Sequence, residues 1–123
     1  MNKFRLTGND CLLLVIDIQE RLAAAMKPEI RDSVVRNTSI LFDLCRVCNI
    51  PALVTEQYPK GLGPTLPELK EKSGSCPVLE KIHFDCMKDD AIRKSIESSG
   101  KKNIIIAGME THICVLQTVL SLV

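Results

Sequence analysis

The feature that most constrains the fold is a continuous apolar run of strand length, Cys11 to Ile16 (CLLLVI). A strand with one face in water alternates apolar and polar side chains, and this run has no such alternation. A run of this kind is typical of a strand that is buried on both faces of a parallel sheet. Two further short runs, Ala52 to Thr55 and Ile104 to Ala107, are predicted to be strands of the same sheet.

Amphipathic helices are predicted between these strands. From Pro28 to Cys48 the apolar residues recur at steps of three, four and seven, which indicates one long helix. A shorter helix is predicted from Asp89 to Ser99, with Ile92 and Ile96 facing inward. Glu56 to Pro67 is dense in glycine and proline and is interpreted as a loop. We therefore expect an α/β fold of three layers, α/β/α, in which helices flank a parallel, Rossmann-like sheet on both faces.

Composition limits the class of protein and its partners. The chain has 123 residues, 46% of them hydrophobic, and a formal net charge of +1, which predicts a single domain over residues 1–123 with a substantial core. This charge indicates neither a nucleic acid nor a membrane as a partner. The amino-terminal segment has no apolar leader, and no apolar run reaches membrane-spanning length, so we predict a cytoplasmic location. Without a signal peptide, the six cysteines are expected to be free thiols.

Three reactive side chains are expected at the carboxyl edge of the sheet. Asp17 directly follows the first strand, and Cys114 follows the strand at Ile104 to Ala107 after a glycine turn. A brief apolar segment, Cys76 to Leu79, is interpreted as a further strand that delivers Lys81 to the same edge. Open α/β folds bind ligands at this edge. A nucleophilic thiol, a carboxylate and an ammonium placed together there can serve as nucleophile, proton acceptor and electrostatic support.

The helix that is predicted from Cys114 to Val123 bears on the reactivity of the thiol. A cysteine in the first turn of a helix lies near the positive end of the helix dipole, which favours its thiolate and an oxyanion beside it. Each of the three residues also has an ordinary interpretation. Cys114 can be a small buried apolar residue, Asp17 a helix cap and Lys81 a solvated side chain.

The sequence argues against a metal site or a nucleotide cofactor. Cys45 and Cys48 form a CxxC pair late in the long helix, where a redox motif is not expected and where core packing is the better interpretation. A zinc site needs a second pair of ligands at regular spacing, which Cys76, His83 and Cys86 do not supply. The chain also lacks the glycine-rich motifs of phosphate and dinucleotide binding. We predict no cofactor and no metal.

Four segments resemble, in the same order along the chain, the motifs of the isochorismatase-like cysteine hydrolases. They are VIDIQERL at Val15 to Leu22, TEQYPKGLG at Thr55 to Gly63, EKIHF at Glu80 to Phe84 and GMETHICV at Gly108 to Val115. The resemblance covers essentially the whole chain, and the TEQYPKGLG segment is similar to the subgroup of isochorismatase domain-containing proteins, whose substrate is unassigned. It implies the isochorismatase-like hydrolase fold.

The resemblance also implies the roles of particular residues. Asp17, Lys81 and Cys114 match the Asp-Lys-Cys triad of that family, which acts on a small amide, ester or related molecule through a covalent thioester. The family has a cis peptide bond at the position between Met109 and Glu110. Its oxyanion hole corresponds to the backbone N–H groups of Glu110 and Cys114.

Neighbouring polar residues have weaker assignments. Gln19 and Tyr58 are interpreted as substrate-binding, with the alternative that Gln19 only braces its turn. Glu110 and His112 have the alternative of a structural role. The nicotinamidases of this superfamily bind a divalent ion through histidines after the second strand, where this chain has none.

The end of the sequence leaves two interpretations open. Domains of this family usually continue well beyond the nucleophile helix, whereas this chain stops at Val123 within an apolar helical pattern that has no cap. Either the chain lacks the C-terminal part of its domain, or a partner covers that face. We expect a homo-oligomer, a dimer or larger. The alternative to an enzyme is a catalytically inactive or truncated subunit that acts as an oligomeric scaffold.

Overall fold

The computed structural model describes residues 4–123 and contains a four-stranded parallel sheet with the strand order β3-β2-β1-β4. Its strands are β1 (Cys11–Ile16), β2 (Ala52–Gln57), β3 (Val78–Lys81) and β4 (Asn103–Gly108). The predicted α/β class and parallel sheet are confirmed. The uninterrupted apolar run of β1 is explained by its central position, because all six of its residues are buried.

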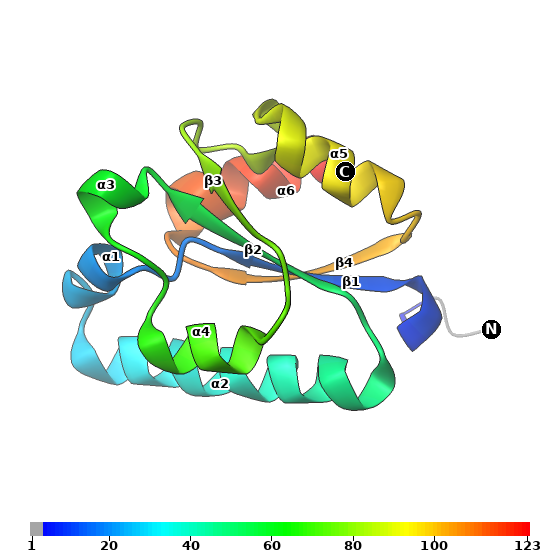
Figure 1. Ribbon diagram of the computed structural model, residues 1–123, viewed down its shortest axis with the longest axis horizontal. Helices are drawn as coiled ribbons and strands as arrows, with labels where there is room; N and C mark the ends of the chain where they lie inside the picture. Colours follow the sequence, from blue (N-terminus) through cyan, green and yellow to red (C-terminus); the bar gives the residue numbers. More distant parts are fainter. Residues whose placement is uncertain (1–3) are drawn as a thin grey trace.

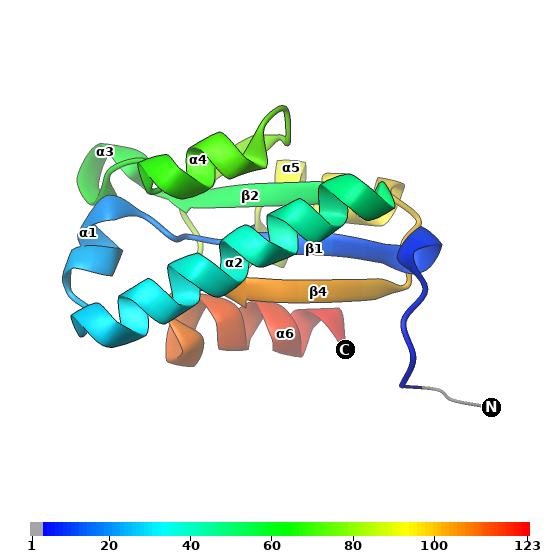
Figure 2. The ribbon, with the colours of Figure 1, turned by 90° about the horizontal axis from the view of Figure 1, so that it is seen from below.

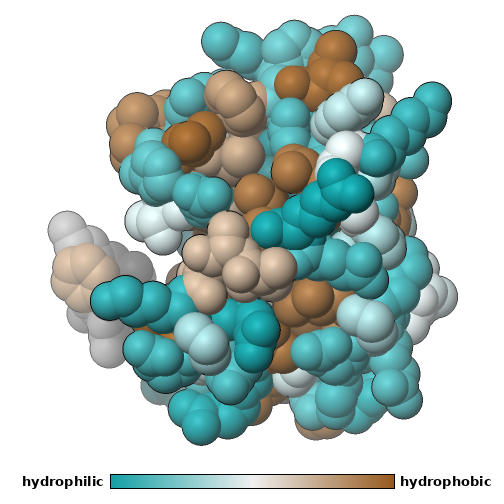
Figure 3. All heavy atoms as spheres, turned by 90° about the vertical axis from the view of Figure 1, so that its left-hand side faces the viewer, coloured by the Kyte–Doolittle hydropathy of each residue, from teal (hydrophilic) through white to brown (hydrophobic). Residues whose placement is uncertain are grey.

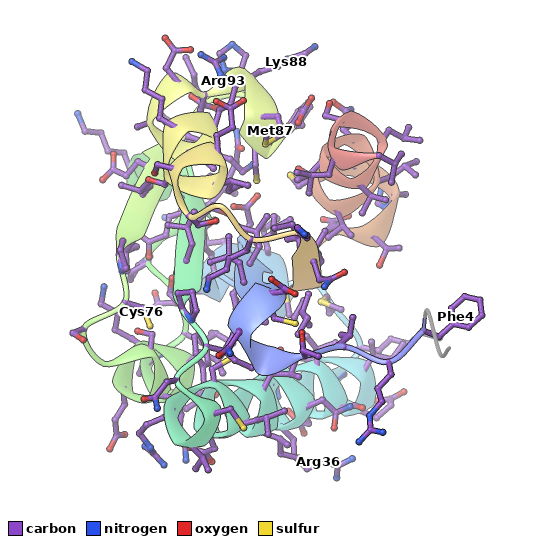
Figure 4. All side chains as sticks on the ribbon, turned by 90° about the vertical axis from the view of Figure 1, so that its right-hand side faces the viewer. Phe4, Arg36, Cys76, Met87, Lys88 and Arg93 are labelled. Carbon is purple, nitrogen blue, oxygen red and sulfur yellow. The ribbon has the colours of Figure 1, made fainter. Side chains whose placement is uncertain are left out.

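Helices cover both faces of this sheet. They are α1 (Glu20–Ala24), α2 (Pro28–Cys48), α3 (Pro59–Leu62), α4 (Pro67–Ser73), α5 (Asp90–Ser98) and α6 (Leu116–Leu122), with single turns η1 (Gly8–Asp10), η2 (Cys86–Lys88) and the π-helical η3 (Thr111–Val115). Figure 1 shows α2 and α4 on one face and α5 and α6 on the other. Seen from below in Figure 2, α2 crosses β1 obliquely, and Figure 4 shows the same layers from the end opposite α1 and α3.

Two apolar clusters form the core, one on each face of the sheet. Leu13 and Val15 of β1 point toward α2 and α4, where they join a cluster with Phe42, Cys45 and Leu69. The alternate residues of β1 point to the opposite face and pack with α5, α6 and η3 in a cluster of Leu12, Leu14, Ile16, Leu53, Cys86, Ile92, Ile96 and Cys114. The prediction that Ile92 and Ile96 face inward is confirmed.

Several predicted boundaries need correction. The second strand continues to Gln57, so Glu56 and Gln57 are strand residues, and the rest of the predicted loop contains the short helix α3. The third strand begins at Val78 and ends at Lys81, which therefore belongs to the strand. The final helical segment begins at Thr111 with a π-helical turn, three residues before the predicted start. The two strands extend beyond their apolar runs because they pair with each other, Glu56 with Glu80 and Gln57 with Lys81. The early start of η3 comes instead from its own turn, in which the Glu110 carbonyl oxygen accepts the N–H groups of Ile113 and Val115.

A close approach of backbone at Gly108 joins the last strand to the first. Gly108 is paired with Ile16, and a Cβ atom on Gly108 would lie 2.5 Å from the Ile16 carbonyl oxygen and 2.7 Å from the Ile16 Cβ. Both distances are too short for any side chain. Glycine at this position therefore allows β4 to end beside β1, which brings the segment after Gly108 close to Asp17.

Two further properties of residues 4–123 concern membrane-spanning helices and the state of the cysteines. No helix of this part of the chain is long and apolar enough to cross a bilayer. All six cysteines are free, and their exposure differs: Cys48 at the end of α2 is exposed, whereas Cys86 and Cys114 are buried in the core.

Candidate active site

The predicted edge residues meet where the strands end. Lys81 of β3 is paired with Gln57 of β2. Ile16, the last residue of β1, is paired with Thr55 of β2, so Asp17 follows β1 directly beside the end of β2. Parallel strands bring their carboxyl ends to one edge, which is the end of the molecule that carries α1 and α3 in Figure 1. Figure 3 shows this face, where apolar side chains are interspersed with hydrophilic ones.

Asp17 and Lys81 form a buried ion pair. The distance between Asp17 Oδ2 and Lys81 Nζ is 2.8 Å, and both side chains are 0% exposed. The other carboxylate oxygen, Oδ1, accepts a hydrogen bond of 2.8 Å from the Thr55 hydroxyl. The backbone of Asp17 is in the left-handed region with φ 53°, a conformation that non-glycine residues adopt mainly at functional or tightly constrained positions. The carboxylate is therefore held from both sides.

The ammonium group of Lys81 has no donor to spare. Besides Asp17, it donates to Gln57 Oε1 at 2.6 Å, to the His83 carbonyl oxygen at 3.0 Å and to the Phe84 carbonyl oxygen at 3.1 Å. An ammonium carries three N–H bonds, and four oxygen atoms already share them. Lys81 therefore acts on the site through its charge and not through a free hydrogen bond.

Cys114 lies in η3 and is 5% exposed. Burial raises the pKa of its thiol to about 12, the negative charge of Asp17 and a hydrogen bond with Asp17 add to the rise, and the charge of Lys81 partly offsets it. The expectation that a helix start favours the thiolate is therefore wrong for the free protein. Removal of the sulfur from water outweighs the helix dipole, and only the seven-residue α6 follows η3. The thiol is protonated at neutral pH and needs a proton acceptor to react.

Alkylation of Cys114 should report this raised pKa. Only the thiolate is nucleophilic, so the rate should rise about tenfold per pH unit between about pH 7 and about pH 10 without levelling off. A small free thiol should level off near its own pKa of about 8.5. The rates are measured with iodoacetamide and peptide mass spectrometry. A plateau for Cys114 below about pH 8 would contradict the assignment of a raised thiol pKa.

A small cavity of about 80 Å³ opens onto Cys114. Its lining comes from α1, β2, α3, the segment after β3 and η3, and comprises Leu22, Gln57, Leu62, Phe84, Glu110, Ile113 and Cys114. Such a space holds a group of only a few non-hydrogen atoms. The cavity therefore leaves room for a small group against the sulfur, with the Asp17 and Lys81 ion pair buried nearby.

Two predicted substrate contacts lie elsewhere. Gln19 is 0% exposed, and its amide donates to the carbonyl oxygens of Gln57 at 3.0 Å and Gly63 at 2.8 Å. Its Oε1 accepts the Gln57 N–H at 2.6 Å. The geometry supports the alternative that Gln19 braces its surroundings. Tyr58 is 55% exposed and lines a different hollow, together with Pro59 and Glu80, so it does not reach the cavity at Cys114.

The turn before Cys114 carries the groups that the family resemblance assigned to the oxyanion hole. The Met109–Glu110 peptide bond is cis. The Glu110 carbonyl oxygen accepts the N–H groups of Ile113 at 3.2 Å and Val115 at 3.3 Å, the two residues that flank Cys114. The Glu110 side chain lines the cavity, and its Oε2 lies 3.5 Å from His112 Nε2.

Sequence reasoning missed two residues of this site, Thr55 and Gln57. Thr55 holds Asp17 and Gln57 holds Lys81. They are two apart on β2, and residues at this spacing lie on the same face of a strand. The second strand was predicted to end at Thr55, and Gln57 was assigned to a loop. The shared face of Thr55 and Gln57 could therefore not be recognised from the sequence.

Among the described residues, no group of three or more His, Cys, Asp or Glu side chains is arranged to hold a metal ion.

Comparison with known proteins identifies the family. A family model described as the isochorismatase domain matches residues 11–123. The chain belongs to the isochorismatase family. Isochorismatase domain-containing protein 2 of Danio rerio is 38% identical over 117 residues, which cover 93% of this chain and 56% of that protein. This chain thus spans little more than half the length of that relative.

Two solved structures of family relatives share the fold closely. One is described as MAR1 ribonuclease from Caenorhabditis elegans, with a TM-score of 0.85, 36% identity and coverage of 96% of this chain and 59% of that one. The other is the YcaC gene product of Escherichia coli, described as an octameric hydrolase of unknown specificity. Its TM-score is 0.85 at 29% identity, and coverage is 99% of this chain and 61% of that chain.

Proposed function

We propose that this isochorismatase-family chain is a cysteine hydrolase that acts on a small amide, ester or related molecule through a covalent thioester. The observation that carries this proposal is the buried Asp17–Lys81 ion pair at 2.8 Å beside the buried thiol of Cys114, where a cavity opens. A buried ion pair is a poor means of adding stability, because desolvation offsets most of the attraction. Its position next to a nucleophilic side chain supports a chemical role.

In the first half of the reaction, Asp17 takes the proton from the thiol of Cys114. The thiolate attacks the carbonyl carbon of the substrate, and the carbonyl oxygen becomes an oxyanion that accepts hydrogen bonds from the backbone N–H groups of Glu110 and Cys114. Each such donor contributes roughly 3 kcal/mol in characterised hydrolases. The oxyanion then collapses, the bond to the leaving group breaks, and the leaving group takes the proton from Asp17.

In the second half, water hydrolyses the thioester. Asp17 accepts a proton from the water while the hydroxide attacks the acyl carbon, and the proton returns to the sulfur as the carboxylic acid leaves. Throughout, the positive charge of Lys81 stabilises the carboxylate of Asp17 and the transient thiolate. The raised pKa of Cys114 agrees with this order of steps, because the thiol proton must be removed during the reaction and not before it.

Hydrolysis of a panel of small amides, esters, ureides and vinyl ethers tests this proposal. Turnover by the wild-type chain that is absent from Cys114→Ala supports a cysteine hydrolase. An RNA oligonucleotide belongs in the panel, because a relative is described as a ribonuclease. Cleavage of the RNA alone, with intact amides and esters, would contradict the proposal.

We also propose a homo-oligomer, the state described for the Escherichia coli relative. Leu116 and Leu120 of α6 are exposed and offer apolar surface for it. Light scattering on the protein used for the substrate panel gives the mass of the particle in solution. The mass of a single chain would contradict the proposed oligomer. An oligomer without turnover on any substrate would instead favour the inactive scaffold.

A further inference from the structure

The described side chains that line the cavity beside Cys114 include no partner for a substrate carboxylate. Besides the cysteine, its lining consists of four apolar side chains, the amide of Gln57 and the carboxylate of Glu110. A substrate carboxylate that leaves water needs an arginine, a lysine or several N–H donors as partners. Within residues 4–123, no side chain that lines the cavity is cationic.

The nearest described cation to the site cannot take this role. Lys81 is 0% exposed, and its ammonium group is already surrounded by Asp17, Gln57 and two backbone carbonyl oxygens. Its positive charge is balanced by Asp17 at 2.8 Å, so the pair adds no net charge to the site. The remaining ionisable side chain of the lining, apart from Cys114 itself, is Glu110. Its carboxylate lies 3.5 Å from the largely exposed ring of His112, outside the lining, and would repel an anion inside the cavity.

We infer that the site selects uncharged substrates with a compact, mainly apolar acyl group, and that the Glu110 side chain determines this selectivity by excluding carboxylates. The inference rests on the proposed function and names its substrate class. The space of about 80 Å³ against the sulfur favours a compact acyl group. The apolar walls favour a group without charge.

A pair of alkylating agents that differ in charge tests the inference without any need for turnover. Iodoacetamide is neutral and iodoacetate is anionic, and both transfer a two-carbon group to a thiolate as iodide leaves. The exposed thiol of Cys48 in the same chain serves as the internal reference. The measured quantity is the rate ratio of iodoacetamide to iodoacetate at Cys114, divided by the same ratio at Cys48. We expect this quotient to be about ten or more, because a like charge in a partly desolvated site disfavours the anion.

Two variants assign the effect to Glu110. Glu110→Gln removes the charge with nearly the same shape, and it should lower the quotient severalfold. Glu80→Gln is the matched control, since Glu80 lies at the same edge of the sheet but lines the hollow with Tyr58 and not the cavity at Cys114. It should leave the quotient unchanged.

Each outcome decides one point. A quotient near one, or a preference for iodoacetate, overturns the inference, and an equal effect of Glu80→Gln and Glu110→Gln overturns the role of Glu110. If the quotient is high but no amide or ester is hydrolysed, the charge selectivity stands and the proposed function fails. If carboxylate-bearing and neutral substrates are hydrolysed equally well, the proposed function stands and the selectivity fails.

Discussion

Cys114→Ala is expected to lower the rate of hydrolysis by about a thousandfold or more, because the attacking sulfur is lost. Among the described residues, Cys114 is the only cysteine that lines the cavity, so no other thiol can replace it. Substrate binding should change little, because the cavity walls and the backbone N–H donors remain. The effect is measured as kcat with the best substrate of the panel, and binding is measured by calorimetry.

Cys114→Ser should be nearly as inactive as the alanine variant. A hydroxyl is a far weaker acid than a thiol, and a single carboxylate beside it cannot remove its proton readily. Cys48→Ala is the matched control, since it removes an exposed thiol at the end of α2 and should retain activity. A Cys114→Ser protein with turnover within about tenfold of the wild type would contradict a cysteine nucleophile.

The buried ion pair should show strong coupling in stability. Lys81→Met leaves the Asp17 carboxylate buried without its partner, and Asp17→Asn leaves the ammonium in the same position. Each is expected to lower the free energy of unfolding by about 3–5 kcal/mol, whereas the double variant Asp17→Asn/Lys81→Met should recover most of the loss. Urea denaturation measures all three. The exposed pair Lys72–Asp43 at 2.9 Å is the control, and Lys72→Met should hardly move the unfolding midpoint.

Asp17→Asn should change the acidity of the Cys114 thiol and the rate of hydrolysis in opposite directions. Asp17 raises the pKa of Cys114 through its charge and its hydrogen bond, so removal of the charge should lower that pKa. At a fixed neutral pH, more thiolate is then present, and alkylation of Cys114 should be faster than in the wild type. Hydrolysis should nevertheless be slower, because the proton acceptor is gone. Slower alkylation together with slower hydrolysis, or additive losses of stability in the double variant, would contradict the assigned role of Asp17.

Residues with a strong one-dimensional signal could be placed from the sequence. The unbroken apolar run gave the bounds of β1, and the spacing of apolar residues together with Pro28 gave those of α2. The edge position of Asp17 followed from β1. The meeting of Asp17 with Lys81 was expected, and the distance of 2.8 Å between them agrees with that expectation.

Other properties depend on three-dimensional surroundings that a sequence does not display. The pKa of Cys114 was expected to fall, because the helix dipole is readable from the sequence whereas the degree of burial is not. Gln19 is polar and near the site, but its amide is fully engaged by β2 and the loop after it. Tyr58 belongs to the matched motif, but its side chain lines a different hollow and not the cavity at Cys114. Its backbone is left-handed, with φ 35°, which the sequence does not reveal.

The most direct measurement is the site of acylation by an activated ester. The chain is mixed with p-nitrophenyl acetate, quenched with acid at early times, and analysed by intact mass and peptide mapping. The account predicts one acetyl group on Cys114, released again by water as the reaction ends, and no acetylation of that peptide in Cys114→Ala. An acetyl group that appears on the exposed Cys48 or on surface lysines while Cys114 stays unmodified would contradict it.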